Sequence, residues 1–250
     1  MMQSVSTDLI NLIKDLQKLN TLKSFSLGGG TNLALRYKHR RSDDIDLFTD
    51  QIIGKIGFDQ IRKELELEFG KKIMSFSYPC DENDQFIFAR CFVNEGESLI
   101  KVELIQNMKI ISEIECFEGI KLVSKLDVGL FKLISASNRF AKKDIYDLEY
   151  ICNDIQLIDL FEKLKLKKAL YNKPEDRTIF DLDDELCPIE DPSLLLKFDE
   201  KKSKNHRGPS HSNDEIIAFR GLNWNTARFS WRNKVRELYN AIGYNYPSNH

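Results

Sequence analysis

The sequence lacks the features of a disulfide-bonded, membrane-spanning or broadly basic protein. Its 5 cysteines are odd in number and widely spaced, without a C-x-x-C pair, which excludes a disulfide framework and a zinc ribbon. No stretch approaches the ~18 uncharged apolar residues that a membrane span needs. Lysine and arginine total 37 against 39 aspartates and glutamates, a net charge of −2, so a polyanion site must be local. These absences predict a cytoplasmic protein with no membrane partner.

The 250 residues, of which 42% are hydrophobic, allow one large domain or two smaller ones. Up to about residue 123 the pattern mixes short helices and strands, and from Ser124 onward apolar residues recur at helical spacing. The sequence therefore predicts an α+β fold, with a mixed-sheet domain over 1–123 and a helical domain over 124–250. Helices are predicted over 9–19, 32–37, 56–70, 124–138, 142–153, 155–170, 214–219 and 224–241, and strands over 24–27, 44–48, 72–79, 85–93 and 98–105.

A glycine-rich turn and a pair of aspartates form the first pattern that points to chemistry. Gly28-Gly-Gly-Thr31 directly follows a predicted strand, and Asp44-Ile-Asp46 comes after twelve intervening residues. Strand alternation points Asp44 and Asp46 to the same side, where a cation is needed to hold two carboxylates together. Mg²⁺ is commonly bound by one or two carboxylates plus substrate phosphates, and a glycine turn that opens a helix offers N–H groups to a phosphate. The pattern predicts a site for a metal-bound nucleoside triphosphate.

Glu103 is the candidate for a third metal ligand. It is the acidic residue in the otherwise apolar segment Leu99–Leu104, apart from Lys101. A third carboxylate would complete a two-metal arrangement, in which one ion activates the attacking hydroxyl and the other stabilises the leaving pyrophosphate. An edge-strand acid that faces solvent explains Glu103 equally well, so both interpretations stay open.

The spacing of these motifs resembles a known superfamily. G-G-T, twelve residues and D-x-D is similar to the signature of nucleotidyltransferases with the polymerase-beta-like fold. More narrowly, LGGGTNLALRYKHRRSDDIDLF resembles the opening motif of the AbiEii/AbiGii-type nucleotidyltransferase toxins, a Gly-Gly-Thr turn, an apolar helix, His-Arg-x-Ser and Asp-x-Asp. Asp127-x4-Lys132 and Asp144-x2-Asp147 resemble two further motifs of that family, with Arg139 between them. The resemblance covers about residues 20–155, and Leu126 departs from it by standing where the family has a lysine.

The resemblance implies a fold, an activity and partners. It implies a polymerase-beta-like domain followed by a helical domain that contributes Lys132, Asp144 and Asp147 to the cleft. It further implies Mg²⁺-dependent transfer of a nucleoside monophosphate from an NTP to an RNA, tRNA included, or to a protein hydroxyl. The chain would then be the toxin of a type IV-like toxin–antitoxin or phage-defence pair, with a cognate antitoxin as its partner.

These considerations assign a role to each candidate residue. Lys132 is expected near the phosphates, where its ammonium group stabilises developing negative charge. The candidate catalytic residues are Asp44, Asp46, Lys132 and Asp147, the candidate nucleotide-binding residues are Gly29, Gly30, Thr31, Arg41, Ser42, Arg139 and Asp144, and the candidate metal ligands are Asp44, Asp46 and Glu103.

Two blocks of opposite charge follow in the C-terminal half. Residues 175–191 carry a net charge of −7 and residues 201–236 a net charge of +7. In the basic block, aromatic residues alternate with arginines, and Arg228, Arg232 and Arg236 fall on one helix face at i, i+4 and i+8. Such a stripe can bind an RNA acceptor by its phosphates and bases. It can equally dock against the acidic segment.

Two other functions are compatible with the same residues. A metal-dependent nuclease would use Asp44, Asp46 and Glu103 to hold two metals, although Ile105 stands where a restriction-type nuclease has its lysine. A non-catalytic nucleotide-binding module would keep the site without turnover. NTP-dependent labelling of an acceptor separates the transferase from both.

Overall fold

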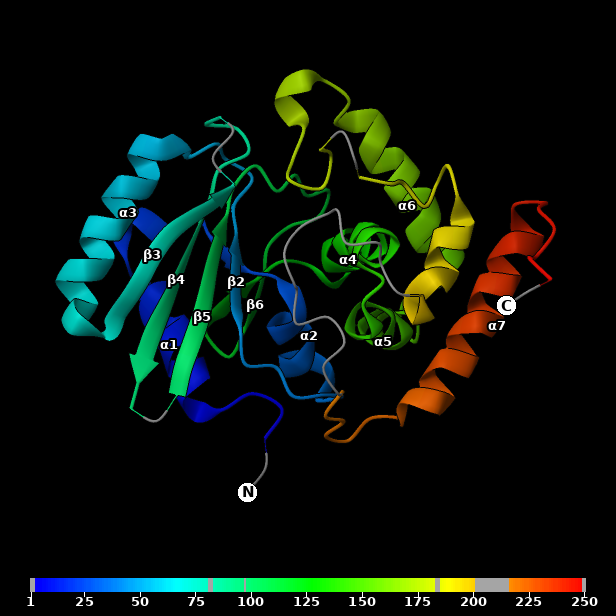
Figure 1. Ribbon diagram of the computed structural model, residues 1–250, viewed down its shortest axis with the longest axis horizontal. Helices are drawn as coiled ribbons and strands as arrows, with labels where there is room; N and C mark the ends of the chain where they lie inside the picture. Colours follow the sequence, from blue (N-terminus) through cyan, green and yellow to red (C-terminus); the bar gives the residue numbers. More distant parts are fainter. Residues whose placement is uncertain (1–2, 81–82, 97, 183–184, 201–215, 249–250) are drawn as a thin grey trace.

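The computed structural model describes residues 3–80, 83–96, 98–182, 185–200 and 216–248. Figure 1 shows a β-sheet with α1 (Thr7–Leu16) and α3 (Gly54–Phe69) against it, and a group of helices, α4 (Lys125–Arg139) to α7 (Trp224–Ala241), on the other side of the molecule. The short helix α2 (Gly29–Tyr37) lies between the two parts. The candidate site residues come from both of them.

The strands of the described residues form one sheet in the order β3-β4-β5-β2-β1-β7-β6. Strands β2 and β5 run parallel, as do β1 and β7, and the other neighbours are antiparallel. The sheet is therefore mixed. The strands are β1 (Ser26–Leu27), β2 (Ile45–Phe48), β3 (Ile73–Cys80), β4 (Phe88–Glu95), β5 (Ser98–Ile105), β6 (Glu115–Phe117) and β7 (Ile120–Leu122).

The helices begin where the sequence provides caps. Ser6 caps α1 by accepting a hydrogen bond from the Leu9 N–H at 3.2 Å, and Ser124 caps α4 by accepting one from the Asp127 N–H at 3.0 Å. Such caps satisfy backbone donors that the helix leaves free. The remaining elements are α5 (Lys142–Ile151), α6 (Leu157–Leu170) and the 3₁₀ turns η1 (Asn20–Leu22), η2 (Gly70–Lys72), η3 (Pro174–Asp176) and η4 (Pro192–Asp199).

Side chains alternate across the parallel pair β2 and β5. The apolar ones pack into one core with α1 and α3, whereas Asp46 and Glu103, which stand between them, point to the opposite face of the sheet. A second core joins α4 to α7 and includes Phe48, whose ring contacts Phe131 of α4 edge to face at 5.6 Å. The polar face of β2 and β5 thus lies on the side of α4. The apolar side chains of the first core are Ile45, Leu47, Val102 and Leu104.

The predicted α+β class with a mixed sheet is confirmed, and most predicted elements match the observed ones within a few residues. Helix α2 begins at Gly29 instead of residue 32, and β6 and β7 were not predicted. The predicted helix over 214–219 is wrong for residues 216–219, which form no helix and make backbone contacts with residues 39–41, while 214–215 lie outside the described residues. The division at residue 123 stays a prediction. No helix in the described part of the chain is long and apolar enough to span a membrane.

Candidate active site

The glycine turn brings the backbone against the Asp46 carboxylate. Gly28 donates its N–H to the Asp46 carbonyl at 2.8 Å, and Gly29 has a φ of +60°, a conformation that side chains other than glycine's rarely adopt. A Cβ at Gly29 would collide with the Asp46 carboxylate, and a Cβ at Gly30 would collide with the Arg40 guanidinium. The two glycines are therefore required for close approach, on one side to Asp46 and on the other to Arg40.

Thr31 joins this turn to the segment before β2. Its hydroxyl lies 2.9 Å from the Ser42 hydroxyl and also contacts the Asp44 carbonyl. Thr31 is fully buried, so its hydroxyl supports the loop that carries the aspartates. A direct contact of Thr31 or Ser42 with a nucleotide stays a prediction.

The three candidate metal ligands lie on one face of β2 and β5. Asp46 stands directly beside Glu103 in the register of the two strands. Glu103 accepts hydrogen bonds from Arg90 Nε at 2.7 Å and Nη2 at 2.5 Å. Lys101 Nζ lies 3.3 Å from Glu103 Oε2 and 3.3 Å from Asp44 Oδ2. The sheet thus brings the three predicted carboxylates together, but with a lysine between two of them.

Of the three candidate metal ligands, Asp46 is the one whose carboxylate has no ion-pair partner among the described residues. Among the described residues no ion pair or hydrogen bond to its carboxylate is found. Burial and the neighbouring Glu103 together raise the pKa of Asp46 to about 7, against the opposing effect of Lys101. Burial also disfavours the charge of Glu103, but Lys101 and Arg90 outweigh it and hold the pKa of Glu103 below its usual value.

The oxygen-only donor set is of the kind that Mg²⁺ prefers. In the described part of the chain, however, no three His, Cys, Asp or Glu side chains are close enough together to enclose a metal ion. Lys101 provides a physical reason, since its ammonium group contacts both Asp44 and Glu103. The residues fit a divalent cation in the chemistry of their oxygens, and the metal role of Asp44, Asp46 and Glu103 stays a prediction.

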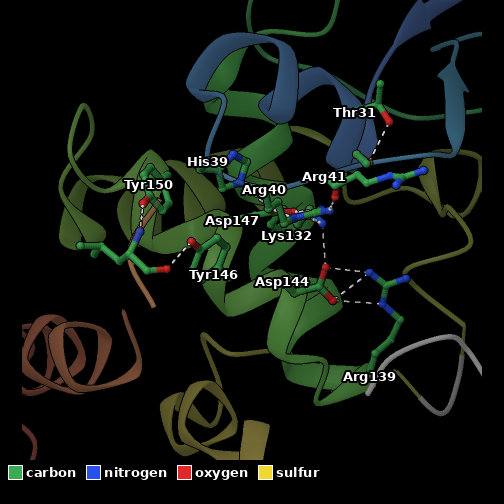
Figure 2. A network of polar contacts seen from close by, with 12 residues as sticks. Thr31, His39, Arg40, Arg41, Lys132, Arg139, Asp144, Tyr146, Asp147 and Tyr150 are labelled. Atoms are coloured by element: carbon green, nitrogen blue, oxygen red, sulfur yellow. Dashed lines mark hydrogen bonds and ion pairs between the residues drawn. The ribbon is translucent and has the colours of Figure 1, made fainter. Parts of the chain in front are cut away.

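A buried ion network faces this site from α4 and α5 (Figure 2). Lys132 Nζ lies 2.8 Å from Asp144 Oδ1 and 2.7 Å from Asp147 Oδ2. The two aspartates are one helical turn apart in α5 and fully buried, so they present their carboxylates to one lysine. The two motifs of the C-terminal half therefore form a single unit.

Arginines from two directions complete this network. Arg40 holds Asp147 with both ends of its guanidinium, Nε at 2.6 Å and Nη2 at 2.8 Å. Arg139 holds Asp144 with Nη2, at 2.7 and 2.8 Å from the two carboxylate oxygens, and with Nε at 3.1 Å (Figure 2). Burial alone would raise the pKa of both aspartates, but these cations outweigh it and hold the pKa of Asp147 well below its usual value and that of Asp144 below it. Three cations surround two carboxylates, which leaves one positive charge in excess.

His39 adds a neutral hydrogen bond to the network. Its Nε2 lies 2.8 Å from Asp147 Oδ1, and because a carboxylate only accepts, Nε2 carries the proton. Burial lowers the pKa of His39 below 6.5 despite the opposing effect of Asp147. The ring stacks on Tyr146 at 5.6 Å. His39 is thus an uncharged, fully buried support of Asp147.

Arg40 links the two halves of the site, because it contacts Asp147 on one side and abuts Gly30 on the other. Arg40 belongs to the basic run Arg36–Arg41. The predicted site residue of this run, Arg41, lies exposed and pairs with Asp43 at 2.8 Å. The sequence analysis missed Arg40 and His39 as site residues. The signal was present, since His39-Arg40 is the start of the His-Arg-x-Ser pattern that resembles the family motif.

The C-terminal strap, residues 216–222, packs against the basic run. Arg41 donates its N–H to Ile217 O at 2.9 Å, and Phe219 donates its N–H to His39 O at 3.0 Å. Between these bonds Arg40 and Ala218 form an isolated antiparallel bridge. The backbone position of Arg40 therefore depends on a segment that lies far away in the sequence.

The basic block divides into core and surface residues. Trp231 is fully buried and donates to Leu195 O at 2.9 Å, whereas Phe229 is 68% exposed. Arg228 and Arg232 pair with Asp199 at 3.5 and 3.3 Å. Asp199 ends η4 and lies outside the acidic segment 175–191. Residues 201–215 of the block lie outside the described residues.

The fold and the site together define a nucleotidyltransferase-type enzyme: a mixed sheet, a glycine turn opening a helix, and an Asp-x-Asp strand facing a buried lysine. A family model described as the nucleotidyl transferase AbiEii toxin of a type IV toxin–antitoxin system matches residues 12–211. The chain belongs to this family. Membership confirms the predicted resemblance and the predicted enzyme class, and it implies an NTP substrate and an antitoxin partner.

A curated relative of this chain is an uncharacterized protein. The chain is 26% identical over 170 residues to the uncharacterized protein aq_aa25 of Aquifex aeolicus (strain VF5). The similarity covers 68% of this chain and 77% of that protein. It adds a relative of similar extent but no substrate.

Proposed function

We propose that the chain transfers a nucleoside monophosphate from an NTP to a hydroxyl group of an RNA, with Mg²⁺ held by Asp44, Asp46 and Glu103. The observation that carries this proposal is the partly buried Asp46 carboxylate, which has no cationic partner among the described residues and a pKa raised to about 7. A divalent cation bound there would polarise the reacting phosphoryl group and favour an ionised acceptor hydroxyl. Asp44 and Glu103 supply the neighbouring oxygens.

The buried network is proposed to bind the triphosphate. The Arg40 guanidinium of this network lies beside Gly30, next to the turn that approaches Asp46. Lys132 and Arg139 would stabilise the charge that develops on the leaving pyrophosphate. Asp144 and Asp147 hold these cations in place, and the N–H groups of Gly29 and Gly30 at the start of α2 offer further donors.

An RNA acceptor is supported by basic side chains at the rim of the site. Arg41 is exposed, and so is Arg220 on the C-terminal strap that pairs with it. Arginine commonly contacts phosphate oxygens of nucleic acids. The arginines of α7 support this role less, because Arg228 and Arg232 already pair with Asp199.

The test is an incubation of the purified chain with Mg²⁺, each NTP labelled at its α-phosphate in turn, and either total RNA or a protein extract as acceptor. Label on RNA that requires Mg²⁺ is the expected result. Asp46→Asn should abolish it, whereas Asp50→Asn, a change of an exposed carboxylate just after β2, should not. Label on protein only would refute the RNA acceptor, and metal-dependent cleavage of RNA without label would refute transfer.

A further inference from the structure

Lys101 lies on the same face of β5 as Glu103. The register of β5 with β2 places Val102 beside Ile45, so the residues that precede them, Lys101 and Asp44, also stand side by side. Lys101 Nζ lies 3.3 Å from Asp44 Oδ2 and 3.3 Å from Glu103 Oε2. One ammonium group therefore bridges carboxylates from two parallel strands, next to Asp46.

Both contacts of Lys101 are loose. Charge-assisted N–H···O bonds are usually about 2.7–2.9 Å long, which is the range that Lys132 reaches with its two aspartates, at 2.8 and 2.7 Å. The Lys101 side chain is 21% exposed, and its stem is flexible. The long contacts, the partial exposure and the flexible stem allow the ammonium group to move off the carboxylates when a competing cation arrives.

Arg90 holds Glu103 independently of Lys101. It binds Glu103 Oε1 from the antiparallel neighbour β4, at 2.7 and 2.5 Å, whereas Lys101 contacts Oε2. If Lys101 moves away, Arg90 still fixes the carboxylate, and Oε2 becomes a free oxygen beside Asp46.

We propose that Lys101 is a built-in counter-ion of the carboxylate site, which bridges Asp44 and Glu103 in the metal-free protein and competes with a divalent cation for their oxygens. This inference rests on the proposed function, because it takes these carboxylates as metal ligands. Lys101 is a positioning residue in this role. It keeps the carboxylates together against their mutual repulsion, and it raises the metal concentration that the site requires.

The test measures metal binding without nucleotide, by electron paramagnetic resonance of free Mn²⁺ and by the rise in Tm with Mg²⁺. Lys101→Met should bind Mn²⁺ more tightly, with a Kd roughly three- to ten-fold lower, because it removes a partly exposed competitor. It should also lower the Tm of the metal-free chain. Lys101→Arg, which keeps the charge, should retain the wild-type Kd. The matched control is Lys72→Met, which removes a lysine that pairs with Glu95 at 3.0 Å elsewhere on the sheet.

An unchanged or higher Kd in Lys101→Met would overturn the inference. If that variant does not fold, Lys101→Gln carries the same expectation of tighter binding. Asp46→Asn in each background should remove the metal response. Equal metal binding by the wild type and Lys101→Met would refute only the role of Lys101. No metal response in either, together with no label transfer, would refute the proposed function.

Discussion

Replacing Asp46 by asparagine should stabilise the metal-free protein while it abolishes transfer. The Asp46 carboxylate is partly buried beside Glu103, and no cation of the described residues pairs with it. Asparagine keeps the shape of the side chain and removes the charge. Asp46, which the proposed transfer requires, is therefore expected to lower the stability of the metal-free fold.

The size of the effect follows from the pKa of Asp46, which rises from 3.8 to about 7 on folding. Such a rise corresponds to about 4 kcal/mol of unfolding free energy when the group is fully charged. The remaining solvent contact of the side chain reduces this to roughly 2 kcal/mol. Between these two pKa values the Asp46 carboxyl binds more protons in the folded than in the unfolded state, so its contribution to the stability of the wild type falls as the pH rises.

The assay is urea unfolding of the wild type and Asp46→Asn in the presence of a chelator, at about pH 8 and about pH 4. At the higher pH the variant should be more stable by the full amount, and at the lower pH the difference should nearly vanish. Asp50→Asn is the control and should change little at either pH. A variant that is no more stable than the wild type at about pH 8, or equally stabilised at both, would refute the reasoning.

Three further predictions concern the network and the turn. Asp147→Asn should lower the unfolding free energy, measured by urea titration, by about 3–5 kcal/mol, because it leaves buried cations uncompensated. Glu66→Gln, which removes one charge of an exposed ion pair, should cost at most about 1 kcal/mol in the same assay. Similar losses in the two variants would show that the network is not buried. Gly29→Ala should cost more stability than Gly70→Ala. Both glycines have a positive φ (+60° and +55°), but only a Cβ at Gly29 meets a neighbouring side chain, that of Asp46. Equal losses in thermal unfolding would contradict the close approach of Gly29 to Asp46. The contribution of His39 to the unfolding free energy should become less favourable as the pH drops below 6.5, because the pKa of His39 is lowered on folding and the unfolded state then binds the extra proton. An imidazole that titrates at or above 6.5 by NMR would contradict this.

The elements and the first half of the site follow from local patterns. Alternation along β2 and β5 places Asp46 and Glu103 on one face, because each is flanked by apolar residues that must be buried. The strands β6 and β7 have three residues each, which is too short for a periodic signal. Their existence depends on pairing with each other and with β1, which no local pattern records.

Most contacts of the buried ion network could not be predicted from the sequence. Lys132, Asp144 and Asp147 follow from a resemblance to family motifs, but the main partners of Asp147 precede it by more than 100 residues. Of two consecutive arginines, Arg40 turns inward and Arg41 outward. That choice depends on the backbone bonds to the C-terminal strap, whose own apolar residues suggested a helix.

The bridge between Arg40 and Ala218 also sets an order of events during synthesis. Close to 180 residues separate the two, which corresponds to on the order of 10 to 35 seconds of translation at about 5–20 residues per second. The sheet and its glycine turn can form on the ribosome well before the strap exists. Arg40, which connects the turn to the buried network, receives its backbone partners only after the residues up to the strap have been synthesised. In a member of a toxin family built in this way, the glycine turn is synthesised well before the segment that fixes the backbone of Arg40 beside it.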